Sequence, residues 1–411
     1  MKSKLFLIPL AFVFLIFVSL ILVPTVASAG QENRLGAGHE PDIYGDRVVW
    51  SSNGSIHLYD ISNKTDTELN SSSTSHPAVY GDKVVWLDNS TENPNLCVYN
   101  ISTGGKFLIT ENVTGDSNYR TGSKPAIYGN VTVWQEYIDN ENPKNRTYKV
   151  HMYDLSTFTR TQISNYGCHY GSPDIYEDRI VWANDSGFFG DSGPIWMYNV
   201  STGNKTKFET WYSYGCVIYG DKLVSHEYGA NYYCIVIYDL STNEVSGVNS
   251  PSDPFDPDIY GDRVVWRDER NCMSDIYMYD MSTANETRIS TNGSASSPAI
   301  YGNRIVWQDR RTNQSAIYMY DLSAEPIKPQ ASFTANATSG KSPLTVLFTD
   351  TSTGGTPTSW YWDFGDGIQS KHAQTATHTF RKAGEYTVSL TATNAAGKDT
   401  LTVKGCIRVS E

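Results

Sequence analysis

The sequence predicts an all-β protein, a seven-bladed β-propeller followed by a small immunoglobulin-like β-sandwich. Two observations carry this prediction. The motif Ile-Tyr-Gly-Asp-Arg-Val-Val-Trp at residues 43–50 recurs in seven variants, whose tyrosines are 36 to 48 residues apart. A period of about 40 residues with four short strands in each repeat is typical of propeller blades. After Ser323 the period ends, and alternating apolar and polar residues continue in a second, smaller unit.

Each copy of the motif is a β-hairpin by its local chemistry. Apolar residues flank a Gly-Asp or similar pair, and glycine suits the first position of a II′ turn. A third strand such as 276–279 follows a variable loop and ends in Asp or Asn, which starts a turn. A short fourth strand such as 286–289 completes the blade. The periodic Trp and Tyr residues of the motif are predicted to pack the blades together.

The seventh copy lacks a fourth strand, because Asp321-Leu322-Ser323 is followed directly by Ala-Glu-Pro. Residues 31–35 resemble the fourth strand at 286–289 and also precede a first strand. We therefore expect residues 31–35 to complete the last blade and to close a propeller that spans residues 30–323. Such closure removes the two exposed sheet edges of an open array.

Residues 1–29 have the pattern of a signal peptide. Lys2 and Lys4 precede an apolar stretch at 5–23, and Ala-Ser-Ala at 27–29 is an A-x-A cleavage site. An uncleaved membrane anchor is the alternative, because the stretch approaches the length of a membrane span. The net charge of −12 argues against nucleic acid and anionic membrane surfaces as partners. We expect an extracellular or cell-surface location, with no membrane contact beyond this segment.

Sequons and cysteines fit an exported protein. Fifteen Asn-x-Ser/Thr sequons make the chain a candidate glycoprotein. Six cysteines permit disulfides in an oxidising compartment, but their spacing does not choose among the pairings. Cys168, Cys216 and Cys234 cluster in blades four and five, and we expect a bridge within this trio.

The chain after the propeller forms a linker and a second domain. Residues 324–330 contain Pro326 and Pro329, which suit a short, semi-rigid linker. Residues 331–411 contain strands with clean alternation, such as 384–391, and their number and spacing suggest an immunoglobulin-like sandwich.

Three motifs of this domain resemble those of the PKD (polycystic kidney disease) domain: Trp-Asp-Phe-Gly-Asp-Gly at 362–367, His-Thr-Phe at 378–380 and Gly-Glu-Tyr-Thr-Val at 384–388. The blade motifs resemble TolB-like propeller repeats. The combination is similar to archaeal cell-surface and surface-layer proteins. This resemblance implies an extracellular or envelope-associated, non-catalytic protein with a role in adhesion, binding or envelope structure, and it carries over no catalytic residue.

The order of the strands assigns the loops to two faces. The first-to-second and third-to-fourth connections of each blade are tight turns on one face, the tight-turn face. The second-to-third and blade-to-blade connections are long and variable, and they share the opposite face, the long-loop face. Binding residues concentrate on loops held by a rigid scaffold. We therefore expect a cell-envelope protein or polysaccharide to bind the long-loop face around the channel mouth.

Aromatic residues single out blade five on this face. Ser225 stands where the other six blades have Trp, and the loops of blades four and five are rich in Tyr, Trp and Phe. Such rings offer a large contact area to a protein or a sugar. The alternative is that they fill the volume left by Ser225 and cover the interface between blades. The candidate ligand-binding residues are Tyr170, Phe188, Trp211, Tyr212, Tyr228, Tyr232 and Tyr233.

Blades six and seven offer charge instead. Arg270 and Arg311 fall in second-to-third loops, where guanidinium groups can bind the carboxylates of an acidic polymer. The alternative is that they pair with neighbouring acidic residues at a solvated rim.

No catalytic constellation stands out. The chain has no HExxH, GxSxG, P-loop or dinucleotide fingerprint, so we expect a non-catalytic protein without cofactor or metal. Loop carboxylates are plentiful, and a carbohydrate-active enzyme with its site at the channel mouth is the alternative. Convergent carboxylates near an Arg or His would favour the enzyme, whereas a flat aromatic or polar rim would favour binding.

Overall fold

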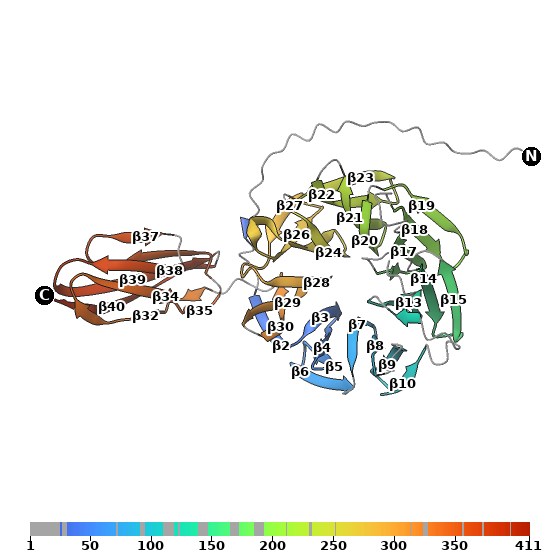
Figure 1. The fold of residues 1–411 in the computed structure, drawn as a ribbon, viewed down its shortest axis with the longest axis horizontal. Coiled ribbons are helices and arrows are strands. Elements are labelled where there is room, and N and C mark those ends of the chain that lie inside the picture. The colour runs from blue at the N-terminus through green and yellow to red at the C-terminus, as the bar shows by residue number, and fades with distance from the viewer. Residues whose placement is uncertain are drawn as a thin grey trace, which may run out of the picture.

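The computed structural model describes most of the chain. Within it, seven antiparallel sheets surround a central axis, and a separate all-β unit follows them in sequence (Figure 1). The described residues are 25–26, 31–70, 73–90, 95–109, 119–121, 124–138, 147–164, 172–184, 193–210, 212–229, 232–250, 252–312, 314–323, 328–355, 357–371, 374–394 and 396–411.

Each sheet is one blade, with its strands in chain order from the axis outward. Blade 1 contains β3 (His39–Tyr44), β4 (Arg47–Ser52), β5 (Ser55–Asp60) and β6 (Thr65–Asn70). Blade 2 contains β7 (Thr74–Tyr80), β8 (Lys83–Asp88), β9 (Asn95–Asn100) and β10 (Lys106–Leu108). Blade 3 contains β12 (Ala126–Tyr128), β13 (Val131–Ile138), β14 (Thr147–Asp154) and β15 (Thr159–Ser164), with β11 (Tyr119–Thr121) added beside β13.

The remaining blades follow the same order. Blade 4 contains β16 (Asp174–Tyr176), β17 (Arg179–Ala183), β18 (Ile195–Asn199) and β19 (Lys205–Phe208). Blade 5 contains β20 (Tyr212–Tyr219), β21 (Lys222–Gly229), β22 (Tyr232–Asp239) and β23 (Glu244–Asn249). Blade 6 contains β24 (Pro254–Tyr260), β25 (Arg263–Asp268), the 3-10 turn η2 (Arg270–Cys272), β26 (Asp275–Asp280) and β27 (Asn285–Arg288). Blade 7 contains β28 (Ala295–Tyr301), β29 (Arg304–Thr312) and β30 (Gln314–Asp321).

The first turn of each blade has the predicted geometry. The glycine that follows the motif tyrosine has a positive φ, for example 60° at Gly45 and 61° at Gly302. The next residue has no positive φ, which is the pattern of a II′ turn. Blade 4 has Glu177 at this position with a φ of 54°, a conformation that is uncommon for a residue with a Cβ.

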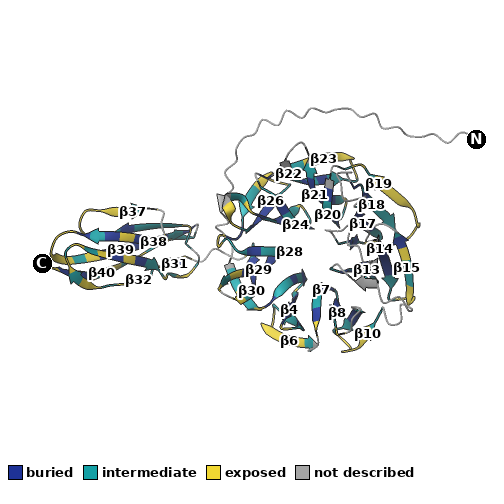
Figure 2. Ribbon diagram, in the orientation of Figure 1, coloured by how far each residue is buried: buried dark blue, intermediate teal, exposed yellow. Residues whose placement is uncertain are grey.

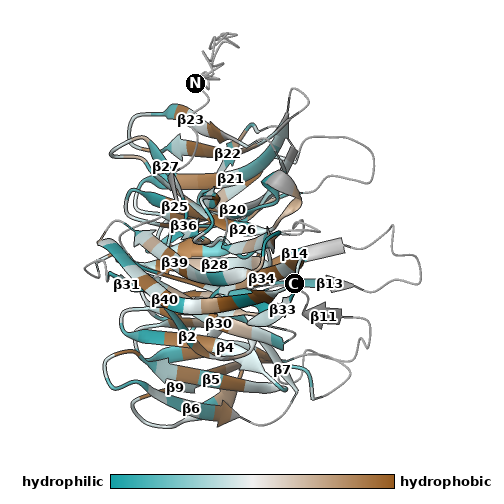
Figure 3. Ribbon diagram, turned by 90° about the vertical axis from the view of Figure 1, so that its left-hand side faces the viewer, coloured by the Kyte–Doolittle hydropathy of each residue, from teal (hydrophilic) through white to brown (hydrophobic). Residues whose placement is uncertain are grey.

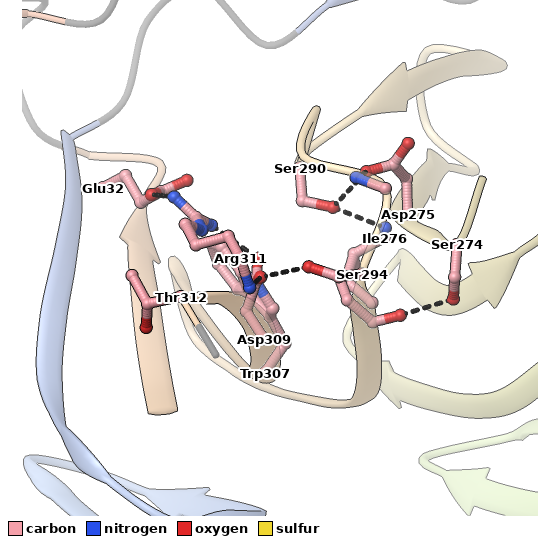
Figure 4. Close-up of polar contacts among 12 residues, drawn as sticks. Glu32, Ser274, Asp275, Ile276, Ser290, Ser294, Trp307, Asp309, Arg311 and Thr312 are labelled. Atoms are coloured by element: carbon pink, nitrogen blue, oxygen red, sulfur yellow. Dashed lines mark hydrogen bonds and ion pairs between the residues drawn. The ribbon is translucent and has the colours of Figure 1, made fainter. Parts of the chain in front are cut away.

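The N-terminal strand closes the ring, as the sequence predicted. Strand β2 (Gln31–Ala37) pairs antiparallel with β30 and is the fourth strand of blade 7. Glu32 on this strand forms an ion pair with Arg311 on β29 (Figure 4). Beyond β2, the chain packs closely on blade 1: a Cβ added to Gly38 would lie 2.3 Å from Trp50 Cδ1. The strand therefore connects the last blade to the first.

The core lies between the blades. All six motif tryptophans are at most 2% exposed, which confirms their predicted role in packing: Trp50, Trp86, Trp134, Trp182, Trp266 and Trp307. One cluster joins Val265 and Ile276 of blade 6 to Ile300 and Trp307 of blade 7, and similar clusters join other neighbours. Buried residues dominate the inner strands and exposed residues the outermost ones, such as β6 and β19 (Figure 2). Apolar segments lie along the strands, with hydrophilic residues at the turns (Figure 3).

The C-terminal unit is a two-sheet sandwich. Its core contains Phe348, Trp362, Phe364 and Phe380. One sheet consists of β32 (Phe333–Ala335), β34 (Leu344–Asp350) and β38 (Thr375–Phe380). The other consists of β33 (Ser339–Lys341), β40 (Gly397–Ser410), β39 (Gly384–Asn394), β36 (Ser359–Asp363) and β37 (Gln369–Lys371), while β31 (Pro329–Gln330) pairs with β35 (Thr353–Gly354).

The predicted signal peptide falls almost entirely outside the described residues. Its exception is β1 (Thr25–Val26), which pairs parallel with β27 at the outer edge of blade 6. Most of the predicted linker, residues 324–327, is also outside. In the part of the chain that is described, no helix has the length and apolar character that a membrane crossing requires.

Candidate functional site in the propeller channel

A closed ring of seven tyrosines surrounds the channel axis. Each tyrosine is the last residue of its blade's first strand, so the ring lies at the tight-turn end of the channel. Neighbouring ring centroids are 4.4 to 5.0 Å apart in tilted contacts, a favourable arrangement for aromatic pairs. The ring forms the floor of the channel and consists of Tyr44, Tyr80, Tyr128, Tyr176, Tyr219, Tyr260 and Tyr301.

Burial raises the pKa of several hydroxyl groups in this floor. Together with electrostatic and hydrogen-bond contacts with Tyr44 and Tyr260, it raises the pKa of Tyr301 to about 12. Burial and the neighbouring hydroxyls also raise the pKa of Tyr80 and of Tyr219. The floor therefore offers aromatic rings, with neutral hydroxyls at Tyr80, Tyr219 and Tyr301.

Three aspartates form the layer above the floor. In blades 1, 4 and 6 an aspartate stands two residues before the ring tyrosine, on the same side of its strand. Each accepts a hydrogen bond from a backbone N–H of the next blade and so joins two blades. The donors and distances are Val79 to Asp42 Oδ2 at 2.8 Å, Ile218 to Asp174 Oδ2 at 2.8 Å, and Ile300 to Asp258 Oδ2 at 2.7 Å.

A single lysine reaches this layer from blade 3. The Lys124 Nζ atom lies 3.0 Å from Asp42 Oδ1. Burial opposes its charge, but the carboxylates of Asp42, Asp258 and Asp174 raise the pKa of Lys124. One ammonium group can interact with blades 1, 4 and 6 only across the central axis. The four side chains therefore converge on the channel.

Two of these carboxyl groups titrate near neutral pH. Burial raises the pKa of Asp174 to about 6 and that of Asp258 to about 7. Backbone hydrogen bonds and Lys124 act in the opposite direction but are outweighed, because removal from water disfavours the charged form. Perturbed carboxyl groups of this kind are concentrated at functional sites.

The channel mouth lies toward the long-loop face. Its residues are those that stand two positions before the aspartate position in the first strand of each blade. Glu40 there accepts a hydrogen bond from the His76 backbone N–H at 2.8 Å, and its Oε1 lies 3.2 Å from His76 Nε2. Burial opposes the charge of Glu40, but His39 and His76 lower its pKa to about 2. Glu40 and His76 lie at β-bulges and have φ values of 55° and 54°, as do Asp256 and Ser297 at 51° and 50°.

Part of the predicted aromatic surface is assembled in blade 5. The rings of Tyr228 and Tyr233 are 4.7 Å apart. Tyr214, Tyr233 and Phe255 surround His226, which is 3% exposed and places its Nε2 2.7 Å from Asp253 Oδ1. We call Tyr214, Tyr228, Tyr233, Phe255 and His226 the blade 5 aromatic cluster. It lies at the strand ends near the long-loop face.

The side chains of the other predicted aromatic residues are not among those described for this cluster. Tyr212 and Tyr232 belong to β20 and β22 and pair with β21, but only their backbone is described. Tyr170, Phe188 and Trp211 lie outside the described residues.

The aromatic cluster does not fill the place of the missing tryptophan. Ser225 and His226 are consecutive on β21, so their side chains point to opposite faces of the sheet. Ser225 is fully buried and bonded to the Ser213 hydroxyl at 2.9 Å. Tyr228 and Tyr233 pack on the other face, with His226. These two rings therefore do not occupy the volume left by Ser225, whereas the contacts of His226 with Phe255 and Asp253 place the cluster at the interface with blade 6, as the second half of the alternative expects.

Arg270 and Arg311 form ion pairs with carboxylates of their own blades. Arg270 lies 2.6 Å from Asp268, pairs with Glu286 and stacks on the Tyr277 ring. Arg311 makes the equivalent contacts with Asp309, Glu32 and Tyr318 (Figure 4). Both guanidinium groups are engaged by carboxylates and an aromatic face, as the pairing alternative expects, although the pairs lie inside the blades instead of at a rim.

The predicted disulfide is not formed between the two described members of the cysteine trio. Cys216 lies on β20 and Cys234 on β22, and no disulfide joins the two. Strand β21 separates them, and two strand spacings of about 4.8 Å exceed the Cα separation that a disulfide spans. Cys168 lies outside the described residues.

The channel layer was missed at the sequence level, although a signal exists. Three of the seven motif copies begin with Pro-Asp-Ile-Tyr, at residues 41–44, 173–176 and 257–260. The periodic tyrosine was assigned to blade packing alone. Among the described residues, no group of three or more His, Cys, Asp or Glu side chains is arranged to hold a metal ion.

Comparison with known proteins supports both domains. The model of the PKD domain family matches residues 330–407. The C-terminal unit is a PKD domain. No curated protein matches the chain in sequence. The PKD match accounts for the C-terminal sandwich. The propeller can be compared with known proteins only through its fold.

Several solved propellers share the fold at low identity. An oligogalacturonate lyase in complex with manganese has a TM-score of 0.56 and 15% identity, covering 73% of this chain and 95% of the lyase. The propeller domain of the Trilobed protease from Pyrococcus furiosus, described as having an open velcro topology, has a TM-score of 0.51 and 12% identity over 70% of this chain and 93% of its own. TolB from Acinetobacter baumannii has a TM-score of 0.42 and 16% identity over 60% and 62%. The similarities to the lyase and to the protease domain show a propeller fold and leave the activity undetermined.

Proposed function

We propose that the protein is a secreted or cell-surface binding protein whose ligand site is the channel mouth on the long-loop face of the propeller. The observation that carries this proposal is the channel itself. It combines a tyrosine floor, a layer of convergent charged groups and a mouth of polar side chains on one side of the molecule. The PKD domain supports an extracellular setting, because such domains are typical of extracellular proteins.

The blade 5 aromatic cluster favours a glycan as the ligand. The Tyr228 and Tyr233 rings can stack on sugar rings, and the His226–Asp253 pair offers polar groups beside them. A cell-envelope protein is the other partner class, since aromatic side chains serve protein contacts equally well.

A glycan array tests this proposal. The protein without its first 30 residues is compared with a Tyr228→Ala/Tyr233→Ala variant and with Phe158→Ala, an exposed aromatic in a tight turn. Loss of two stacking rings is expected to weaken binding roughly 5- to 150-fold, at about 0.5–1.5 kcal/mol for each ring. Phe158→Ala is expected to leave binding unchanged. A complete lack of glycan binding, or equal loss in both variants, would contradict the glycan proposal.

A carbohydrate-active enzyme is a second candidate function. Asp42, Asp174 and Asp258 converge beside Lys124, an arrangement close to the one that favours an enzyme, with a lysine in place of the Arg or His. A carboxyl group with a pKa of about 7, such as that of Asp258, can donate a proton at neutral pH. Mass spectrometry of the same glycan mixtures distinguishes the two functions. Shortened glycans that disappear with Asp258→Asn would indicate the enzyme, whereas intact glycans indicate binding.

A further inference from the structure

We infer that Asp42, Asp174 and Asp258 determine the ligand class of the proposed site: the channel accepts a ligand group that is cationic or uncharged and rejects carboxylated or sulfated polymers. This inference rests on the proposed channel-mouth function and deepens it. It also separates this propeller from the oligogalacturonate lyase of similar fold, whose name states an anionic substrate.

The charge of the channel is the first argument. Carboxyl groups stand at the aspartate layer in blades 1, 4 and 6, and two of these blades add a second carboxyl group at the mouth, namely Glu40 in blade 1 and Asp256 in blade 6. Lys124 is the one lysine or arginine among the described residues at these two levels. Channels with low-dielectric walls focus the field of such groups, and a polymer of the same sign is repelled.

The second argument is that two of the three aspartates have no cation of their own. Asp42 holds the Lys124 ammonium at 3.0 Å. Asp174 and Asp258 accept hydrogen bonds from backbone N–H groups, and no ion pair joins either to a described cationic side chain. Buried carboxylates are ordinarily paired with a cation. An ammonium group of a ligand would form an ion pair with Asp174 or Asp258, as Lys124 does with Asp42.

Access to the layer is the third argument. The side chain of Asp42 is 19% exposed and that of Lys124 is 38% exposed, although both lie near the axis. Water therefore reaches both side chains. The aromatic floor below adds to the preference, because the faces of tyrosine rings attract cations.

Calorimetry with three probes tests the inference. Spermidine provides ammonium groups, a hexamer of N-acetylglucosamine is uncharged, and a hexamer of galacturonic acid is anionic. We expect spermidine and the neutral hexamer to bind the full chain without its first 30 residues, and the galacturonate hexamer not to bind. Asp174→Asn/Asp258→Asn is expected to weaken spermidine binding roughly tenfold or more and to leave the neutral hexamer unaffected.

A matched control separates channel charge from net charge. Glu209→Gln/Glu385→Gln likewise removes two carboxyl groups, from side chains that are 81% and 60% exposed, and it is expected to bind spermidine as the wild type does. Circular dichroism confirms that each variant is folded.

Tighter binding of the galacturonate hexamer than of the neutral hexamer would overturn the inference alone. An equal loss of spermidine binding in both double variants would do the same. If the neutral hexamer binds with an affinity that Tyr228→Ala/Tyr233→Ala does not change, the proposed function fails instead. Binding of none of the three probes would overturn both.

Discussion

At the scale of the residue, Asp258 illustrates how the channel alters side-chain chemistry. Burial raises its pKa to about 7 although it accepts a hydrogen bond from the Ile300 backbone. In an unfolded chain the same carboxyl titrates at about 3.9. Between these two values the folded state holds a proton that the unfolded state has released. The free energy of unfolding contributed by Asp258 therefore falls as the pH rises through this window, and it stays constant above the folded pKa.

The first prediction concerns this dependence. Asp258→Asn keeps an oxygen acceptor for the Ile300 N–H but does not ionise. We expect the variant to gain stability relative to the wild type as the pH rises from 4 to 8. Urea denaturation at several pH values measures the difference, and Glu209→Gln, an exposed control, should show no such trend. A difference between Asp258→Asn and wild type that does not change with pH would contradict the raised pKa.

At the scale of the element, a blade is held together by more than its strands. In blades 6 and 7 the motif tryptophan donates to an acidic residue two positions later, at 3.1 Å for Asp268 and 3.3 Å for Asp309. That carboxylate binds an arginine that covers the ring of the third-strand tyrosine. Arg311 also holds Glu32 on the closing strand. An internal polar network thus fastens the strands of one blade to each other.

The second prediction concerns this network. Arg311→Ala would leave Asp309, which is fully buried, without its cation. Removal of one partner of a buried ion pair costs about 3–5 kcal/mol, and we expect a loss of this size in the free energy of unfolding. Arg310→Ala, at the exposed neighbouring position, is the matched control and should change stability by no more than about 0.5 kcal/mol. Equal effects of the two variants would show that the Arg311 network contributes no stability of its own.

At the scale of the whole molecule, the ring depends on a strand from the start of the described chain. Strand β2 supplies the fourth strand of blade 7, and the residues after it pack on Trp50 of blade 1. Without β2, the backbone N–H and C=O groups along β30 would form an open sheet edge. Open edges of this kind pair with other chains.

The third prediction concerns this closure. Deletion of residues 31–37 is expected to lower the melting temperature and to produce self-association through β30. Size-exclusion chromatography with light scattering measures the association, and deletion of residues 1–30 alone is the control. A deletion variant that stays monomeric with an unchanged melting temperature would show that β2 is dispensable for the ring.

Most of the fold could be predicted from the sequence, because local sequence patterns determine it. These patterns are the Gly-Asp turns, the strand periodicity and the repeated tryptophans, each of which is visible within a few residues. They predicted the seven blades and the C-terminal sandwich. The closing strand could be predicted because the seventh copy visibly lacks one. Tyr228 and Tyr233 were predicted as ligand candidates from the aromatic residues of blade 5, whereas their position opposite each other on one hairpin comes from the structure.

What the tertiary structure alone decided are the contacts between blades. Asp42, Asp174 and Asp258 are more than eighty residues apart from one another in sequence, and only the circular arrangement of the blades brings them to one axis beside Lys124. The same holds for the tyrosine floor, in which each ring meets partners from two other blades. Arg270 and Arg311 looked available for ligands until β26, β27, β30 and β2 placed carboxylates and tyrosines around them. Local sequence sets strand and turn, whereas the pairing of charges and the pKa of a buried carboxyl depend on residues distant in the chain, and these appear only when the ring is closed.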